Sequence, residues 1–172
     1  RTQEIVRDCR VPLVLVPPAR GDSPWKLERI LMPHDGTPTT AAAFAPAVDL
    51  AQAASAELVV LHSAEAGAEP PREPGSYGGP QYVDQPQHEW PAWAHEFLER
   101  LGCIGCIPAG LRVRLVLATG APGDQIIKYA DEHDVDLIVV AWRGQWEPQR
   151  ARTVRSVVKS TPCPIVLLRT SQ

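Results

Sequence analysis

Residues 33–37, with the sequence PHDGT, place an imidazole and a carboxylate side by side directly after a short apolar run. The carboxylate of Asp35 could accept hydrogen bonds from an amine or from sugar hydroxyl groups. It could equally form an Asx-turn at a helix start, because Thr37 and Pro38 suit an N-cap and a first helical position. The imidazole of His34 titrates near neutral pH, but the sequence pairs it with no nucleophile. We therefore expect a binding site here and no catalytic residue.

A second chemically active segment runs from residue 140 to residue 159 and is rich in arginine. A guanidinium group binds phosphate through paired N–H donors. Arg152 would stand near the start of a helix, where added positive charge is unfavourable unless an anion or a carboxylate neutralises it. These side chains could bind an anion, or they could form a solvated helix face paired with acids such as Glu147. The basic residues are Arg143, Arg150, Arg152, Arg155 and Lys159.

Six short runs rich in Val, Ile and Leu predict the strands that position these segments. Their nearly continuous hydrophobicity is typical of strands buried on both faces of a parallel sheet. The helical stretches between them favour an α/β fold built of right-handed βαβ units. A ligand of such a sheet binds beyond the carboxyl ends of the strands, where the strand order reverses. The predicted strands are Pro12–Val16, Arg29–Met32, Glu57–His62, Arg112–Ala118, Asp136–Ala141 and Pro164–Leu168.

The first predicted helix begins at Thr37 and extends to Ala54, and Pro46 inside it should kink it or delay its start. Residues 63–91 are rich in proline and glycine and show no periodicity. We interpret them as a long surface loop, either disordered or folded over the sheet as a lid, and disorder is the preferred interpretation. The other predicted helices are Ala92–Leu101, a helix begun by Pro122 and Asp124, and Arg152–Ser160.

The composition excludes several classes of protein. The chain has 172 residues, enough for one domain with a sizeable core, and its formal net charge of -3 gives no basic field that would attract nucleic acid. No apolar run approaches the roughly 20 residues that cross a bilayer. Four cysteines in a chain of this length do not form a disulfide framework. We expect a cytoplasmic protein that binds neither nucleic acid nor membrane.

The two ends of the chain carry an internal repeat. Residues 4–16, EIVRDCRVPLVLV, align without a gap to residues 156–168, SVVKSTPCPIVLL. A helix end, a proline and an apolar strand thus recur, and repeats of this kind indicate tandem domains. We interpret residues 1–18 as the tail of a preceding domain, 19–26 as a linker and 27–170 as a domain that contains the loop at 63–91.

The last predicted strand, residues 164–168, leaves an open apolar edge on the sheet, and such an edge must be covered. The repeated strand at residues 12–16 is the obvious candidate, because the chain from Pro17 to Glu28 can span about 40 Å at roughly 3.3 Å per residue. We expect these strands to pair antiparallel, within one chain or between two copies. The protein would then be a homodimer or an intramolecular pseudo-dimer.

Four segments together resemble the universal stress protein family: RILMPHDGT, AELVVLHS, GAPGDQIIKYADEHDVDLIVVA and STPCPIVLLR. The match spans about residues 27–170. The resemblance implies an open, parallel, five-stranded Rossmann-like sheet with helices on both faces, and an adenine-nucleotide site in some members. It also implies dimers through the last strand and tandem copies in some chains. The chain looks like the second domain of such a tandem protein.

The phosphate-binding loop departs from the family pattern, which has a glycine, two residues, a second glycine, a spacer of nine and then Gly-Ser or Gly-Thr. The family's glycines let backbone N–H groups curl around phosphates. Here Ala141 and Gly144 take the first two glycine positions, and Ala151 and Arg152 take the Gly-Ser pair. The spacer is three residues shorter, two tryptophans flank the turn, and the hydroxyl is lost. We therefore expect a degenerate nucleotide site.

The resulting prediction is a stress-response regulatory module that acts through association and binds a small anionic ligand, with no cofactor or metal required. One alternative is a member that binds ATP with magnesium and uses arginines in place of the glycines. A second is a nucleotide hydrolase or transferase, which is less favoured because Asp35 is the only carboxylate that can be placed at the rim. The predicted binding residues are Pro33, His34, Asp35, Gly36, Thr37, Ser63, Val140, Ala141, Gly144 and Arg152.

Overall fold

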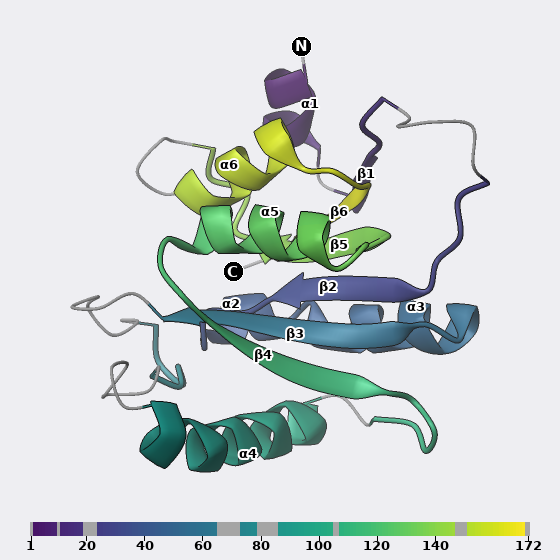
Figure 1. Cartoon of the computed structure of the whole chain (residues 1–172). Helices are drawn as coiled ribbons and strands as arrows, with labels where there is room; N and C mark the ends of the chain where they lie inside the picture. The colour runs from purple at the N-terminus through teal and green to yellow at the C-terminus, as the bar shows by residue number, and fades with distance from the viewer. Residues whose placement is uncertain are drawn as a thin grey trace.

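The computed structural model describes residues 2–9, 11–18, 24–64, 73–78, 86–104, 107–146 and 151–170. They build a six-stranded sheet in the order β1-β6-β5-β2-β3-β4 (Figure 1). β1 pairs antiparallel with β6, and the other neighbours pair parallel. The predicted five-stranded parallel sheet with an added N-terminal edge strand is confirmed. The strands are β1 (Leu13–Leu15), β2 (Arg29–Pro33), β3 (Glu57–Ala64), β4 (Val113–Thr119), β5 (Leu137–Trp142) and β6 (Ile165–Arg169).

Helices cover both faces of the sheet (Figure 1). One face carries α1 (Thr2–Asp8), α5 (Pro122–Glu132) and α6 (Arg152–Ser160). The other carries α2 (Pro38–Ala41), α3 (Phe44–Ala54) and α4 (Pro86–Ile104). Among the described residues, no helix is long and apolar enough to cross a membrane.

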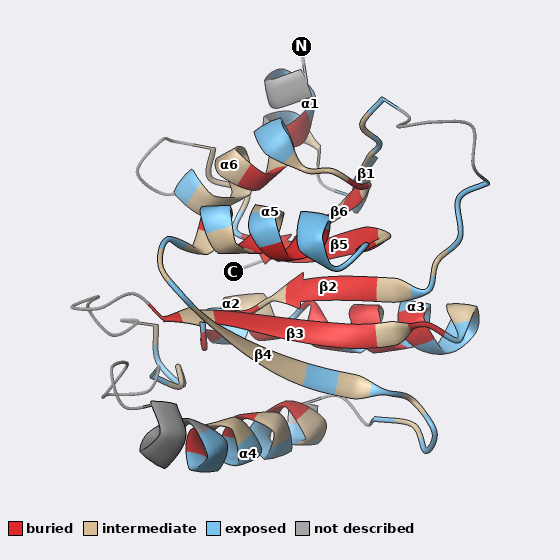
Figure 2. Ribbon diagram, in the orientation of Figure 1, coloured by how far each residue is buried: buried red, intermediate tan, exposed pale blue. Residues whose placement is uncertain are grey.

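The central strands are buried on both faces, as their uninterrupted hydrophobicity predicts. Ile30 and Met32 pack into the core under α3 and α4, whereas Leu31 between them packs into the core under α5 and α6. Figure 2 shows the result as buried strands at the centre, with helices that are buried only on their inner sides. The strand ends that carry the predicted site residues are therefore held by packing from two directions.

The first predicted helix is divided into α2 and α3. Thr37 is the N-cap of α2, and its hydroxyl accepts a hydrogen bond from the N–H of Thr40. Pro46 lies in the first turn of α3, where a missing N–H costs no helical hydrogen bond. The expectation that Pro46 delays the helix start is confirmed.

The segment predicted as one loop over residues 63–91 is shorter than expected. β3 continues to Ala64 and α4 begins at Pro86. Residues 73–78 are packed against the domain: Tyr77 donates its N–H to Gly36 and stacks on Trp93. Disorder is therefore wrong for residues 73–78, and the lid alternative fits them better. Residues 65–72 and 79–85 lie outside the described part of the chain.

The N-terminal strand covers the edge of β6 within the same chain. Leu13 lies opposite Leu167, and Leu15 lies opposite Ile165. Both leucines of β1 pack toward the core that contains Val6 of α1. The expected antiparallel pairing thus occurs intramolecularly.

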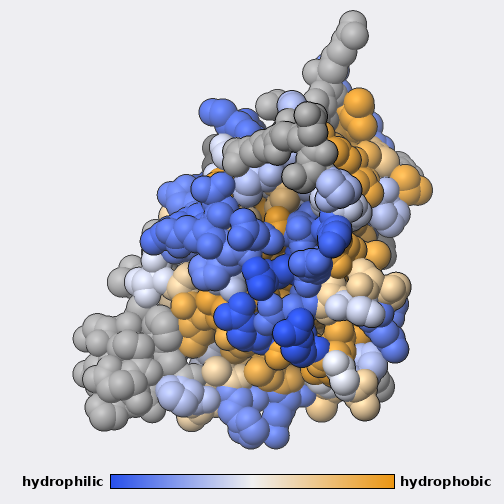
Figure 3. Space-filling view, turned by 45° about the vertical axis from the view of Figure 1, so that its right-hand side comes forward, coloured by the Kyte–Doolittle hydropathy of each residue, from blue (hydrophilic) through white to orange (hydrophobic). Residues whose placement is uncertain are grey.

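Part of the N-terminal segment is apolar and exposed: the exposed fraction of Val14 is 57% and that of Val16 is 72%. Figure 3 turns the right-hand side of Figure 1 forward and shows hydrophilic side chains across the centre of that face, with hydrophobic patches around them. Scattered exposed apolar residues are usual on a protein surface.

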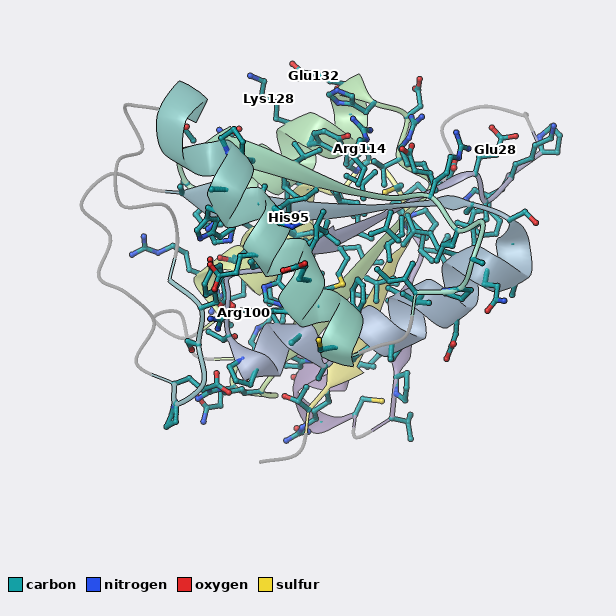
Figure 4. The ribbon with its side chains drawn as sticks, turned by 90° about the horizontal axis from the view of Figure 1, so that it is seen from below. Glu28, His95, Arg100, Arg114, Lys128 and Glu132 are labelled. Atoms are coloured by element: carbon teal, nitrogen blue, oxygen red, sulfur yellow. The ribbon has the colours of Figure 1, made fainter. Side chains whose placement is uncertain are left out.

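The amino ends of the strands are tied together by charged groups. The Glu57 carboxylate lies 3.1 Å from Arg29 and 3.2 Å from Arg114. Burial alone would raise the pKa of Glu57, but hydrogen bonds and charges from both arginines outweigh it and lower that pKa. Figure 4, seen from below, labels Arg114 on β4, and α4 crosses in front of the sheet. This network lies at the opposite end of the strands from the candidate site.

Candidate functional site

The carboxyl ends of β2 and β5 border a cavity of about 730 Å³. The strand order reverses between these two neighbours: β3 and β4 lie beyond β2 on one side, and β6 lies beyond β5 on the other. In Figure 1 this end is on the left, toward which the β3 arrow points. Eight of the ten predicted binding residues line the cavity: Pro33, His34, Asp35, Thr37, Ser63, Val140, Ala141 and Arg152.

Both predicted glycines lie outside that lining. Gly36 has φ +87°, its N–H donates to His34 Nδ1 at 2.8 Å, and it borders a separate hollow of about 300 Å³. Gly144 has φ +74°, and the space that a Cβ would occupy is filled by the guanidinium of Arg169. The glycine that survives from the family pattern therefore accommodates a side chain of β6 and does not face the cavity.

The Asp35 side chain organises the start of α2. One carboxylate oxygen, Oδ1, accepts hydrogen bonds from the Thr37 N–H (2.9 Å), the Thr37 hydroxyl (2.7 Å) and the Thr40 hydroxyl (2.6 Å). This is the Asx-turn that the sequence offered as one role of Asp35. Asp35 is also exposed and lines the cavity, so the same carboxylate can face a ligand.

Two histidines lie beneath this rim in their neutral form. His34 is 6% exposed, and burial lowers its pKa to about 4 against the opposing effect of Asp35. Its Nδ1 accepts the Gly36 N–H, and Nε2 has no partner among the described residues. Burial also lowers the pKa of His62, whose Nδ1 lies 2.9 Å from the His34 carbonyl oxygen. Both imidazoles are therefore neutral at pH 7, and His34 also borders the cavity.

The opposite wall of the cavity is formed by the first turn of α6. The N-cap position is Ala151, whose side chain makes no capping hydrogen bond, so the amide groups of this turn can take an anion. Arg152, Thr153 and Val154 line the cavity. Thr153, one position after the predicted Ala151–Arg152 pair, also carries a hydroxyl group.

Trp142, the last residue of β5, and Trp146 pack against each other and against α6. Trp142 is buried, and its ring meets that of Trp146 edge to face at 5.6 Å. Arg155 donates to the Trp146 carbonyl oxygen at 3.3 Å, and its guanidinium lies 5.8 Å from the Trp146 ring. Arg155 therefore contacts Trp146 and is not among the residues that line the cavity. Glu147 and Arg150 lie outside the described residues.

A second carboxylate, Glu73, lines the cavity, although the sequence placed only Asp35 there. Both of its oxygens lie 2.9 Å from the Thr39 hydroxyl, and it forms an ion pair with Arg143. Arg143 also donates from Nε to the Thr39 hydroxyl at 3.0 Å. The three side chains come from the 73–78 segment, α2 and the residue that follows β5.

Sequence reasoning missed Glu73, Thr39 and Thr153 as cavity residues. Glu73 lies in a segment without periodicity, so no sequence signal places it. Thr39 follows a predicted N-cap by two residues, and that position in the first helical turn was a usable signal. Among the described residues, no group of three or more His, Cys, Asp or Glu side chains could hold a metal ion.

The strand order, with a cavity where it reverses, defines an open α/β fold with helices on both faces of a mostly parallel sheet. A model of the universal stress protein family matches residues 26–169. Universal stress protein YxiE of Bacillus subtilis (strain 168) is 29% identical over 149 residues, which are 82% of this chain and 98% of that protein. The chain belongs to the universal stress protein family.

Solved structures agree with this assignment. Universal stress protein UspA from Lactobacillus plantarum has a TM-score of 0.60 and 25% identity, covering 84% of this chain and 99% of the other. A universal stress protein in complex with cAMP has a TM-score of 0.59 and 19% identity, covering 85% and 99%. A universal stress protein from Archaeoglobus fulgidus DSM 4304 has a TM-score of 0.69 and 18% identity, covering 99% of this chain and 54% of that chain.

Proposed function

We propose that the protein is a regulatory binding module whose cavity takes an adenine nucleotide with one phosphate group, and that it does not turn this ligand over. The observation that carries the proposal is the polarity of the cavity. Asp35, Thr37 and Ser63 provide hydrogen-bonding groups on one side, while Arg152 and the first turn of α6 provide a positive wall on the other. A cavity of about 730 Å³ is large enough for such a ligand.

Several features disfavour a triphosphate. Gly144 packs against the Arg169 guanidinium and is not among the residues that line the cavity, which disfavours a backbone cradle at this glycine. The packed pair of Trp142, at the end of β5, and Trp146 restricts the turn that follows the strand. The universal stress protein in complex with cAMP shares this fold at 19% sequence identity. The residues that line the present cavity are what support an adenine nucleotide as the ligand class.

The absence of turnover is proposed from the state of the titratable groups. A general base must be able to accept a proton near the reacting atom. His34 and His62 are packed in the core with lowered pKa values. The carboxylate of Asp35 is bonded to two threonines, and that of Glu73 is bonded to Thr39 and Arg143. These carboxylates serve structure and binding.

We also propose that the contact between β1 and β6 is an internal copy of a dimer contact, with residues 1–18 as the tail of a preceding unit. The repeat of residues 4–16 and 156–168 supports this proposal, as does the antiparallel pairing of the two repeated strands. The Archaeoglobus fulgidus protein is matched over 99% of this chain but only 54% of its own length. A longer chain with two such units would give that ratio.

The proposal is tested by calorimetric titration of the protein with AMP, adenosine, and ATP with magnesium. We expect AMP to bind more tightly than either of the others. Arg152→Gln should weaken AMP binding five- to tenfold and leave adenosine binding unchanged, because it removes a charge from the phosphate wall. Lys159→Gln is the matched control, since it removes the same charge from the last turn of α6.

Two results would overturn the proposal. Tighter binding of ATP with magnesium than of AMP would show that a triphosphate is the ligand. Release of phosphate or pyrophosphate from ATP, abolished in a cavity variant, would show an enzyme. Mass spectrometry of material extracted from the purified protein checks independently which nucleotide it carries.

A further inference from the structure

We propose that Glu73 occupies the place on Arg143 that the anionic group of a ligand would take, so that anion binding and docking of residues 73–78 exclude each other. These six residues form a strap beside the cavity. The inference deepens the proposed function, because it assigns a regulatory device to the same cavity. It requires only that the ligand carries a phosphate-like anion.

The Glu73 carboxylate is held by two groups. Arg143 contacts it through Nη2, and the Thr39 hydroxyl lies 2.9 Å from both oxygens. The Thr39 hydroxyl in turn accepts from Arg143 Nε at 3.0 Å. All three side chains line the large cavity. A protein carboxylate therefore sits where a guanidinium and a hydroxyl converge, which is the donor set that a phosphate oxygen requires.

The strap is anchored separately at its other end. Tyr77 donates its N–H to the Gly36 carbonyl oxygen at 2.7 Å, and its ring stacks on Trp93. Trp93 donates its indole N–H to the Gly78 carbonyl oxygen at 2.7 Å. The guanidinium of Arg100, labelled on α4 in Figure 4, lies 4.3 Å from the Tyr77 ring. These contacts keep the strap beside the cavity when the Glu73 contact is lost.

The Glu73–Arg143 pair is suited to exchange. The Glu73 side chain is 20% exposed and the Arg143 side chain is 42% exposed, so water reaches both charges and weakens their attraction. A phosphate group carries more charge and more acceptor oxygens than a carboxylate, and it pairs with arginine through two parallel bonds. Two anions cannot share Arg143 without repulsion. A bound phosphate therefore displaces Glu73, and the first part of the strap is released with it.

The first experiment compares Glu73→Gln with Glu99→Gln. Both changes remove one carboxylate charge, but Glu99 lies on α4, exposed and outside the cavity lining. In calorimetric titrations we expect Glu73→Gln to bind AMP and inorganic phosphate three- to tenfold more tightly than the unchanged protein. Adenosine should bind equally to all three proteins because it has no anion to compete with Glu73. Equal phosphate affinities in the two variants would overturn the inference.

The second experiment follows the strap itself by hydrogen exchange. The N–H of Ser76 donates to the Glu73 carbonyl oxygen at 3.1 Å and reports on the first part of the strap. Adding AMP or phosphate should speed its exchange at least threefold in the unchanged protein, and Arg143→Gln should do so without ligand. Slower exchange with phosphate would mean that the anion closes the strap, which contradicts the inference.

The two proposals fail separately. If adenosine and AMP do not bind, but phosphate still binds and releases Ser76, the adenine ligand is wrong and the Glu73 exchange stands. If AMP binds with the same affinity to Glu73→Gln and to the unchanged protein, the exchange is wrong and the ligand proposal stands.

Discussion

Tyr77 and Gly36 are joined by a main-chain hydrogen bond of 2.7 Å, and the carbonyl oxygen of Tyr77 fills the space beside the Gly36 Cα. A Cβ at residue 36 would overlap that oxygen, and φ of +87° is itself unfavourable for an L side chain. We expect Gly36→Ala to lower the free energy of unfolding by about 2–3 kcal/mol, from backbone strain and the lost hydrogen bond. Urea denaturation measures the change.

Gly78→Ala is the control for that prediction. Among the described residues, no atom lies within 4 Å of a Cβ added at this glycine, which belongs to the same strap. Its replacement should change the free energy of unfolding by less than about 0.5 kcal/mol. Equal costs at the two glycines would contradict the assigned contact.

Acid should destabilise the protein through His34. Its pKa is lowered from 6.5 in the unfolded chain to about 4 in the folded protein, mainly by burial. Between these values the unfolded chain binds a proton that the folded protein does not bind, so the free energy of unfolding falls as the pH falls. The full difference corresponds to roughly 3 kcal/mol, and the lowered pKa of His62 adds a loss in the same direction.

The measurement for this prediction is urea denaturation at pH 7 and at pH 4.5. His34→Asn keeps an oxygen that can accept the Gly36 N–H but does not titrate, so its stability should depend less on pH. A variant with the same pH dependence as the unchanged protein would place the titrating group elsewhere.

The pairing of β1 with β6 should contribute to stability through alternate residues of the strand. Leu15 is half-buried against the core, whereas Val14 is exposed. Leu15→Ala should cost about 1–2 kcal/mol, less than at a fully buried site, and Val14→Ala should cost under about 0.5 kcal/mol. Thermal or urea denaturation distinguishes them. A larger cost at Val14 would mean that its side chain is covered by a partner in solution.

The spacing of α5 and α6 depends on Gly123. A Cβ at this residue would lie 2.9 Å from Cβ of Ser156, so one helix must move. We expect Gly123→Ala to cost about 1–2 kcal/mol and to weaken AMP binding, because the first turn of α6 forms a wall of the cavity. Ser156→Gly removes the opposing atom, so the double variant should recover most of both losses. No recovery would show that the effect of Gly123→Ala is local to α5.

Much of the fold could be predicted because it depends on local sequence patterns, namely apolar runs and an internal repeat. Continuous runs of Val, Ile and Leu marked the buried parallel strands, and the repeat at the two ends of the chain predicted the antiparallel edge. The rim at Pro33–Thr37 followed from its place after a central strand. These features depend on residues that are close in sequence or related by a simple period.

The remaining part of the site depends on contacts between distant segments. Glu73 pairs with Arg143, which lies 70 residues away in the sequence. No periodic pattern in the sequence predicts such a contact. The contact of Gly144 with the Arg169 guanidinium of β6 likewise joins residues that are distant in the sequence. The alignment to the family pattern placed Ala151 and Arg152 at the Gly-Ser pair and therefore did not single out Thr153, which also lines the cavity. Contacts between such distant segments are determined by how the helices, strands and loops pack in the folded protein.

β1 is attached to β6 by three residue pairs, and these pairs do not require that both strands belong to the same chain. A β1 donated by another copy of the chain would form the same hydrogen bonds and bury the same leucines. If such an exchanged dimer forms, its balance with the closed monomer is set by the effective concentration of the tethered β1 relative to the concentration of the protein.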